Sequence, residues 1–142
     1  MTVRSAEAKW EGTLNEGNGS MKGGSGALNV PFTFKSRFEE GQAMTNPEEL
    51  LGAAHAGCFT MALNNRLFKN GLAPEYVHTT AQVYFEKTDA GMAITRIHLV
   101  TEGKVPNLDQ AAFAEHAEET KKACIVSRAL SAVPMTVEAK LV

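Results

Sequence analysis

The fold is decided by the stretch TNPEELLGAAHAGCFTMALNNRLFKNG, residues 45–71. Its first residues predict a helix start, because Asn46 can cap a helix, Pro47 suits the first helical position and Glu49 can complete a capping box. The apolar pattern continues to about Phe68 and stops at an Asn-Gly pair, which is typical of a helix end. Because the middle of the stretch is apolar on nearly every face, we expect a buried central helix.

Strands are predicted on both sides of this helix. Apolar and polar residues alternate with period two in four segments: 6–11, 77–85, 93–99 and 135–141. The glycine-rich segment 15–30 is typical of turns between short strands, and a turn at 89–91 predicts a long antiparallel hairpin. Two further helices are expected, at 109–122 and 126–132. The fold class is therefore α+β, with antiparallel sheets packed around the buried central helix.

Composition narrows the class of protein. The 142 residues, of which 44% are hydrophobic and 21% charged, fit one soluble globular domain covering 1–142. The formal net charge of -2 gives no basic excess, so neither nucleic acid nor an anionic membrane surface is an expected partner. The first residues lack the apolar core of a signal peptide, and the longest apolar run, 50–63, is too short to span a bilayer. We therefore expect a cytoplasmic protein.

Two cysteines, Cys58 and Cys124, are the residues best suited to chemistry. They lie 66 positions apart without a CxxC pair, so no structural zinc site, other metal or cofactor is expected. In a reducing compartment they are not expected to form a static disulfide. A peroxide-reducing cycle does use two thiols, because one becomes a sulfenic acid and the second resolves it. Spacing leaves open whether the two meet, and each alone is typical of a small buried residue.

Two neighbours on the predicted helix bear on Cys58. His55, three residues earlier, shares its helix face and could act as a base, or it could be a core histidine bonded to a carbonyl. Glu48 lies ten residues before Cys58, roughly 15 Å away along a straight helix. If Glu48 serves Cys58, the helix must break at Gly52 or Gly57, which would place Cys58 near a helix start that favours a thiolate. The alternative is one straight helix in which Glu48 only complements the helix dipole.

The chain as a whole resembles the osmotically inducible protein C and organic hydroperoxide resistance proteins, the OsmC/Ohr family, and the OsmC branch most closely. Five segments carry the resemblance: AEAKWEG at 6–12, SRFEEG at 36–41, TNPEELLGAAHAGCFTMAL at 45–63, AITRIHLVTEGKVP at 93–106 and C-x-V-S-R at 124–128. The most specific signal is TNPEEL with a cysteine ten residues after its first glutamate.

This resemblance implies a hydroperoxide reductase in which Cys58 is the peroxidatic thiolate and Cys124 the resolving thiol. Arg37 and Glu48 would frame Cys58, because a guanidinium stabilises the thiolate and the leaving alkoxide while the carboxylate holds it in place. We therefore expect Cys58 to lie at or just after a break in the central helix, with Glu48 folded back towards Arg37. The resemblance further implies an intertwined OsmC-like homodimer that prefers organic hydroperoxides and is re-reduced by a dithiol such as a lipoyl group.

One departure and one set of side chains concern the substrate site. The family usually has proline after the second cysteine, and this chain has Ile125, which leaves Cys124 less rigidly placed and could add apolar wall. Further wall candidates, for which ordinary core packing is the more common role, are Phe38, Met44, Leu51 and Phe59.

Two other function classes fit the residues. A cysteine acyl hydrolase would use Cys58 as nucleophile and His55 as base. A non-catalytic module would bind an apolar ligand or sense redox state through the buried helix. Full activity without Cys124 would favour the hydrolase, and lipid binding without peroxide consumption would favour the module.

Overall fold

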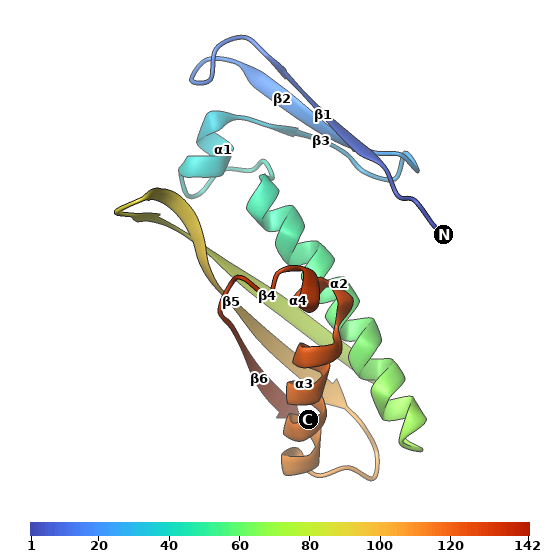
Figure 1. The fold of residues 1–142 in the computed structure, drawn as a ribbon. Helices are drawn as coiled ribbons and strands as arrows, with labels where there is room; N and C mark the ends of the chain where they lie inside the picture. Colours follow the sequence, from blue (N-terminus) through green and yellow to red (C-terminus); the bar gives the residue numbers. More distant parts are fainter. The chain divides into compact units, whose positions relative to one another are not determined.

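The computed structural model describes all residues, 1–142, and divides into two compact units, Met1–Leu50 and Leu51–Val142. The elements of the first unit are β1 (Ala6–Glu11), β2 (Asn18–Gly23), β3 (Asn29–Phe32), α1 (Phe34–Phe38) and the first turn of α2 (Pro47–Lys69). The second unit holds the rest of α2 and then β4 (Tyr76–Thr88), β5 (Gly91–Lys104), α3 (Gln110–Ala123), α4 (Ile125–Ala129) and β6 (Met135–Leu141). The α+β class is confirmed (Figure 1).

The first unit is an antiparallel sheet in the order β1-β2-β3, followed by α1. The glycine-rich segment forms turns between short strands, as its sequence predicts. Helix α1 has no counterpart in the sequence-based expectation, because five residues are too few to show a helical period. Its N-terminus is nonetheless closed by a capping box: Ser36 N–H donates to Thr33 Oγ1 at 3.1 Å, and Thr33 N–H donates to Ser36 Oγ at 2.9 Å.

Helix α2 is one continuous helix of 23 residues, so the predicted break near Gly52 or Gly57 is wrong. A glycine inside a helix costs only about 0.5–1 kcal/mol, which packing readily offsets. Gly52 in fact allows a close approach to β4, because a Cβ there would lie 3.4 Å from Val83 Cγ2. The helix starts at Pro47 as expected, with Asn46 Oδ1 accepting from Glu49 N–H at 2.8 Å. The Glu49 carboxylate does not complete the expected capping box, because it accepts from Thr45 Oγ1 at 2.8 Å instead.

The sheet of the second unit has the order β4-β5-β6 and corrects one expectation. Strands β4 and β5 form the predicted long antiparallel hairpin, but β6 pairs with β5 in parallel, so the sheet is mixed. The reason is the connection, because α3 and α4 together carry the chain back to the end of the sheet from which β5 started.

The core of the second unit lies between α2, α3 and the sheet. Its buried apolar residues are Phe59, Leu63, Leu67, Ile97, Leu99, Val105, Phe113, Ala117 and Cys124. The opposite face of α2 exposes Met61 and Phe68, at 76% and 70% of their surfaces. Thus α2 packs through one face and leaves apolar side chains on the other. No helix combines the length and the apolar character needed to cross a membrane.

Candidate active site

The two cysteines, 66 positions apart in sequence, meet in the second unit. Cys58 lies in the middle of α2, and Cys124 is the single residue between α3 and α4. Their Sγ atoms are 3.3 Å apart and both thiols are free. A disulfide needs a separation of about 2.05 Å, so the bond could form with a small approach of the two side chains.

The two thiols differ in exposure and in backbone support. Cys124 is 1% exposed, whereas Cys58 is half-buried. The backbone of Cys124 is bonded on both sides: its N–H donates to the Thr120 carbonyl at 2.8 Å, and its carbonyl accepts from Arg128 N–H at 2.9 Å. A reagent from solution therefore meets Cys58 first, with Cys124 held behind it.

His55 is a core histidine. Its Nε2 lies 2.7 Å from Ser127 Oγ, and both side chains are buried. Its Nδ1 has no hydrogen-bond partner, so neither ring nitrogen is hydrogen-bonded to a cysteine sulfur. Burial lowers the pKa of His55 below its ordinary value of 6.5, which keeps the imidazole neutral. His55 shares a helix face with Cys58 but makes no hydrogen bond to its sulfur, which disfavours a Cys58–His55 acyl hydrolase. The partner of the ring is a hydroxyl rather than the expected carbonyl.

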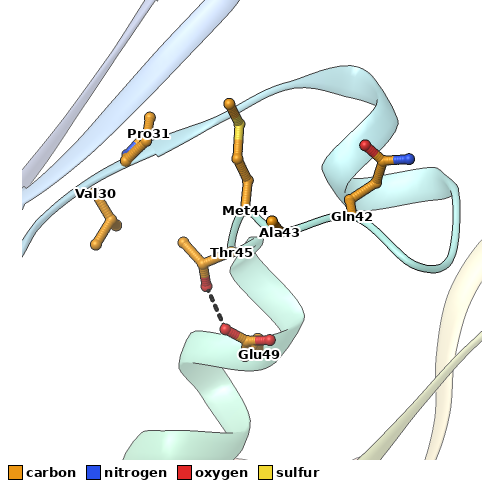
Figure 2. A pocket seen from close by; sticks show the side chains of 7 residues that line it. All are labelled: Val30, Pro31, Gln42, Ala43, Met44, Thr45 and Glu49. Atoms are coloured by element: carbon orange, nitrogen blue, oxygen red, sulfur yellow. Dashed lines mark hydrogen bonds between the residues drawn. The ribbon is translucent and has the colours of Figure 1, made fainter.

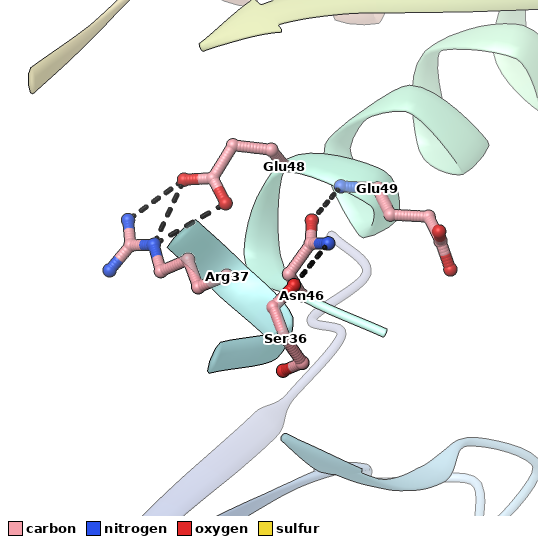
Figure 3. A network of polar contacts seen from close by, with 5 residues as sticks. All are labelled: Ser36, Arg37, Asn46, Glu48 and Glu49. Atoms are coloured by element: carbon pink, nitrogen blue, oxygen red, sulfur yellow. Dashed lines mark hydrogen bonds and ion pairs between the residues drawn. The ribbon is translucent and has the colours of Figure 1, made fainter. Parts of the chain in front are cut away.

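Arg37 of α1 and Glu48 of the first turn of α2 form a bidentate pair (Figure 3). Arg37 Nη2 donates to Glu48 Oε1 at 2.8 Å, and Nε lies 3.1 Å and 3.3 Å from the two carboxylate oxygens. The Glu48 side chain is 9% exposed and that of Arg37 39%. Asn46 Nδ2 donates to the Ser36 carbonyl at 3.1 Å, which ties the start of α2 to α1. The expected folding of Glu48 towards Arg37 is found without any break in the helix.

The continuous helix sets the spacing between this pair and Cys58. Ten residues of α-helix rise roughly 15 Å, so Glu48 and Cys58 of one chain are far beyond hydrogen-bond reach along α2. Of the four site residues expected from the sequence, the fold brings Cys58 to Cys124 and Arg37 to Glu48, as two separate pairs.

The residues named as candidates for an apolar wall differ widely in exposure. Phe59 is fully buried in the core, Leu51 is half-buried, and Ile125 is 73% exposed. Met44 is 44% exposed and lines a cavity of about 380 Å³ in the first unit (Figure 2). The other residues around this cavity are Val30, Pro31, Gln42, Ala43, Thr45 and Glu49. Phe38 lies under the Arg37 guanidinium, 5.5 Å from ring centroid to Cζ.

Ser127 is a site neighbour that sequence reasoning missed. The signal for it was the spacing of C-x-V-S-R, which puts Ser127 three residues after Cys124, as His55 is three before Cys58. The structure holds no group of three or more His, Cys, Asp or Glu side chains placed to bind a metal ion.

Comparison with known proteins gives the family. The family model described as OsmC-like protein matches residues 39–139. Peroxiredoxin OsmC of Escherichia coli K12 is 46% identical over 134 residues, which are 93% of each chain. The chain belongs to the OsmC family. The resemblance read from the five sequence segments is therefore confirmed.

Solved structures of OsmC and Ohr proteins share the fold. The organic hydroperoxide resistance protein OhrB of Bacillus subtilis matches with a TM-score of 0.73 at 24% identity, covering 97% of this chain and 98% of its own. An OsmC-like protein of unknown function from Vibrio cholerae matches with a TM-score of 0.78 at 14% identity, covering 98% and 99%. Within the OsmC match lie Cys58, Cys124 and Glu48, and Arg37 lies two residues before it.

Proposed function

We propose that this OsmC protein reduces organic hydroperoxides to alcohols, with Cys58 as the peroxidatic thiol and Cys124 as the resolving thiol. The observation that carries the proposal is the 3.3 Å approach of a half-buried sulfur to a fully buried one. A peroxidase role agrees with family membership, since the E. coli relative is named a peroxiredoxin.

The cycle uses each sulfur once. The Cys58 thiolate attacks the terminal oxygen of ROOH, an S–O bond forms as the O–O bond breaks, and the alkoxide takes a proton to leave as ROH. The Cys124 sulfur then attacks the Cys58 sulfenic acid, an S–S bond forms, and hydroxide leaves as water with the thiol proton. A dithiol supplies two electrons and two protons to restore both thiols.

Arg37 and Glu48 are proposed to stabilise the charges on Cys58 and on the leaving alkoxide. The carboxylate holds the guanidinium by three contacts of 2.8 to 3.3 Å, which leaves little freedom for the planar donor group. Since roughly 15 Å of helix separates Glu48 from Cys58 in one chain, we propose that the pair serving each Cys58 comes from a second copy in a homodimer. The exposed Met61 and Phe68 of α2 are apolar surface that such a copy could cover.

The proposed chemistry is tested with two cysteine variants. Cys58→Ser should consume no organic hydroperoxide in a dithiol-coupled assay. Cys124→Ser should still undergo one oxidation, and dimedone should trap its Cys58 sulfenic acid as a mass increase. Dithiol-driven peroxidase activity that persists in Cys58→Ser would exclude the assignment.

The shared site is tested by complementation. Arg37→Ala and Cys58→Ser should each be inactive alone. When the two variants are co-folded, about half of the dimers are mixed and each mixed dimer has one working site of two, so about a quarter of the wild-type rate should return. If every site is built within one chain, the mixture stays inactive.

The reductant and compartment complete the proposal. We propose a dithiol such as a lipoyl group as electron donor, and the cytoplasm as the location, because a cycle of free thiols suits a reducing compartment. Faster turnover with dihydrolipoamide than with glutathione at equal thiol concentration would support the donor class, and the reverse order would exclude it. The single OsmC-like domain over 1–142 stays a prediction.

A further inference from the structure

Two side-chain pairs join α2 to the α3–α4 junction. Cys58 meets Cys124 with 3.3 Å between sulfurs, and His55 meets Ser127 with 2.7 Å between Nε2 and Oγ. His55 and Cys58 are three residues apart on α2, and so are Cys124 and Ser127 on the other segment. Residues at this spacing share a helix face, so the two pairs lie side by side.

The His55–Ser127 hydrogen bond is buried, and it is the only side-chain hydrogen bond of His55. His55 is 0% exposed and Ser127 4%, and the other ring nitrogen of His55 has no partner. Because the ring is excluded from water, breaking this hydrogen bond would leave the imidazole without any polar partner. A buried polar group without a partner is destabilising, so the contact strongly favours one register of the two segments.

The Ser127 contact adds a polar anchor to the short helix α4. It has five residues, too few to be stable alone, and Cys124 at its start makes no side-chain capping hydrogen bond. Ile125, the first residue of α4, is 73% exposed, and the apolar packing of the helix comes from the partly buried Val126. Ser127 is the buried residue of this helix. Its hydroxyl therefore connects α4, and with it Cys124, to α2.

We infer that His55 and Ser127 are a positioning pair that holds Cys124 in line with Cys58 for the disulfide-forming step. The inference rests on the proposed peroxidase cycle and concerns only its second half: the Cys58 S–O bond breaks, the S–S bond forms, and hydroxide leaves as water with the Cys124 proton. Neither His55 nor Ser127 contacts the hydroperoxide. The first half, oxidation of Cys58, does not depend on the pair.

Ser127→Ala is the primary test. With one equivalent of an organic hydroperoxide, Cys58 should be oxidised at a rate within about twofold of wild type, whereas disulfide formation should slow by about five- to tenfold, the loss expected for one buried hydrogen bond. The sulfenic acid should therefore live longer, so dimedone traps more of it and Cys58 reaches sulfinic acid at lower peroxide. His55→Leu should behave alike, and His55→Gln, whose amide nitrogen can replace Nε2, should recover most of the rate.

The control separates positioning from a general loss of stability. Thr79→Val removes another buried hydroxyl contact, Thr79 Oγ1 to Thr101 Oγ1 at 2.9 Å, between β4 and β5. It should lower the melting temperature without changing the ratio of sulfenic acid to disulfide. An unchanged ratio in Ser127→Ala, or an equal change in Thr79→Val, overturns the inference.

A second readout distinguishes this inference from the proposed function. Diamide closes the Cys58–Cys124 bond without any peroxide chemistry, and that closure should also slow in Ser127→Ala. Slower closure in a protein that does not consume hydroperoxides would support the positioning pair and refute the peroxidase. Equal closure rates in a working peroxidase would refute only the positioning pair.

Discussion

Closing the bond between Cys58 and Cys124 should stabilise the fold measurably. The bond would tie together residues 66 positions apart, and the loop-closure relation gives about 4 kcal/mol for a loop of that length at 25 °C. Native-state strain should subtract little, because the sulfurs are already 3.3 Å apart. The unfolding free energy of the oxidised protein should therefore exceed that of the reduced protein by an amount approaching this figure.

Urea unfolding followed by circular dichroism measures this difference. The protein is oxidised with diamide or kept reduced with a phosphine, so the result does not depend on turnover. At a slope of about 2 kcal/mol per molar urea, the midpoint should rise by about 2 M. Cys124→Ser, treated in the same way, should show no shift. A gain below about 1 kcal/mol, or a loss, would refute the reasoning, since it would mean that the helices must move apart for the bond to form.

Three other contacts give measurable expectations. Burial lowers the pKa of His55, so the unfolded chain takes up a proton before the folded one as the pH falls below 6.5. The unfolding free energy of the wild type should therefore fall by up to about 1.4 kcal/mol per pH unit in that range. In melting temperatures measured from pH 7.5 to 5, His55→Gln should show a flatter dependence on pH. Gly103→Ala should lower the unfolding free energy measured with urea by about 1–3 kcal/mol, because its Cβ would lie 2.6 Å from Phe113 Cζ. Adding Phe113→Leu should restore part of this stability, and an unchanged urea midpoint in Gly103→Ala would contradict the prediction. A double-mutant cycle of Arg37→Ala and Glu48→Gln should give a coupling of about 1–2 kcal/mol, reduced from a buried pair by the exposure of Arg37, and additive effects would show that the pair contributes nothing.

Elements that depend on local sequence patterns could be predicted. The Asn46 cap, the alternation of the β4–β5 hairpin and the start of α3 near residue 109 appear close to their expected positions. The helix break was not found, because glycine only weakens a helix locally, and Gly52 instead provides close packing against β4. The parallel pairing of β6 depends on how α3 and α4 return the chain, which no local pattern encodes.

Part of the candidate site could likewise be predicted from the sequence, and part could not. The resemblance pointed to Cys58, Cys124, Arg37 and Glu48, and the fold brings them together as two pairs. The His55–Ser127 contact joins residues 72 positions apart, and no local pattern predicts it, because serine and histidine occur in many structural environments. Only the packing of α4 on α2 makes them partners.

The unequal burial of the two sulfurs also determines how the proposed cycle is reset. An incoming thiolate can reach the sulfur of Cys58, whereas Cys124, at 1% exposure, is shielded on all sides. The mixed disulfide should therefore form on Cys58, with Cys124 as the leaving group returning to its place in the core. A monothiol then needs a second molecule to attack the reductant's sulfur in the mixed disulfide, so that Cys58 leaves as a thiolate. A dithiol carries this second nucleophile with it at high effective concentration, and closes its own disulfide as Cys58 is released. In the proposed cycle, the unequal burial of the two sulfurs should therefore favour a dithiol over a monothiol reductant, without any dedicated binding contact.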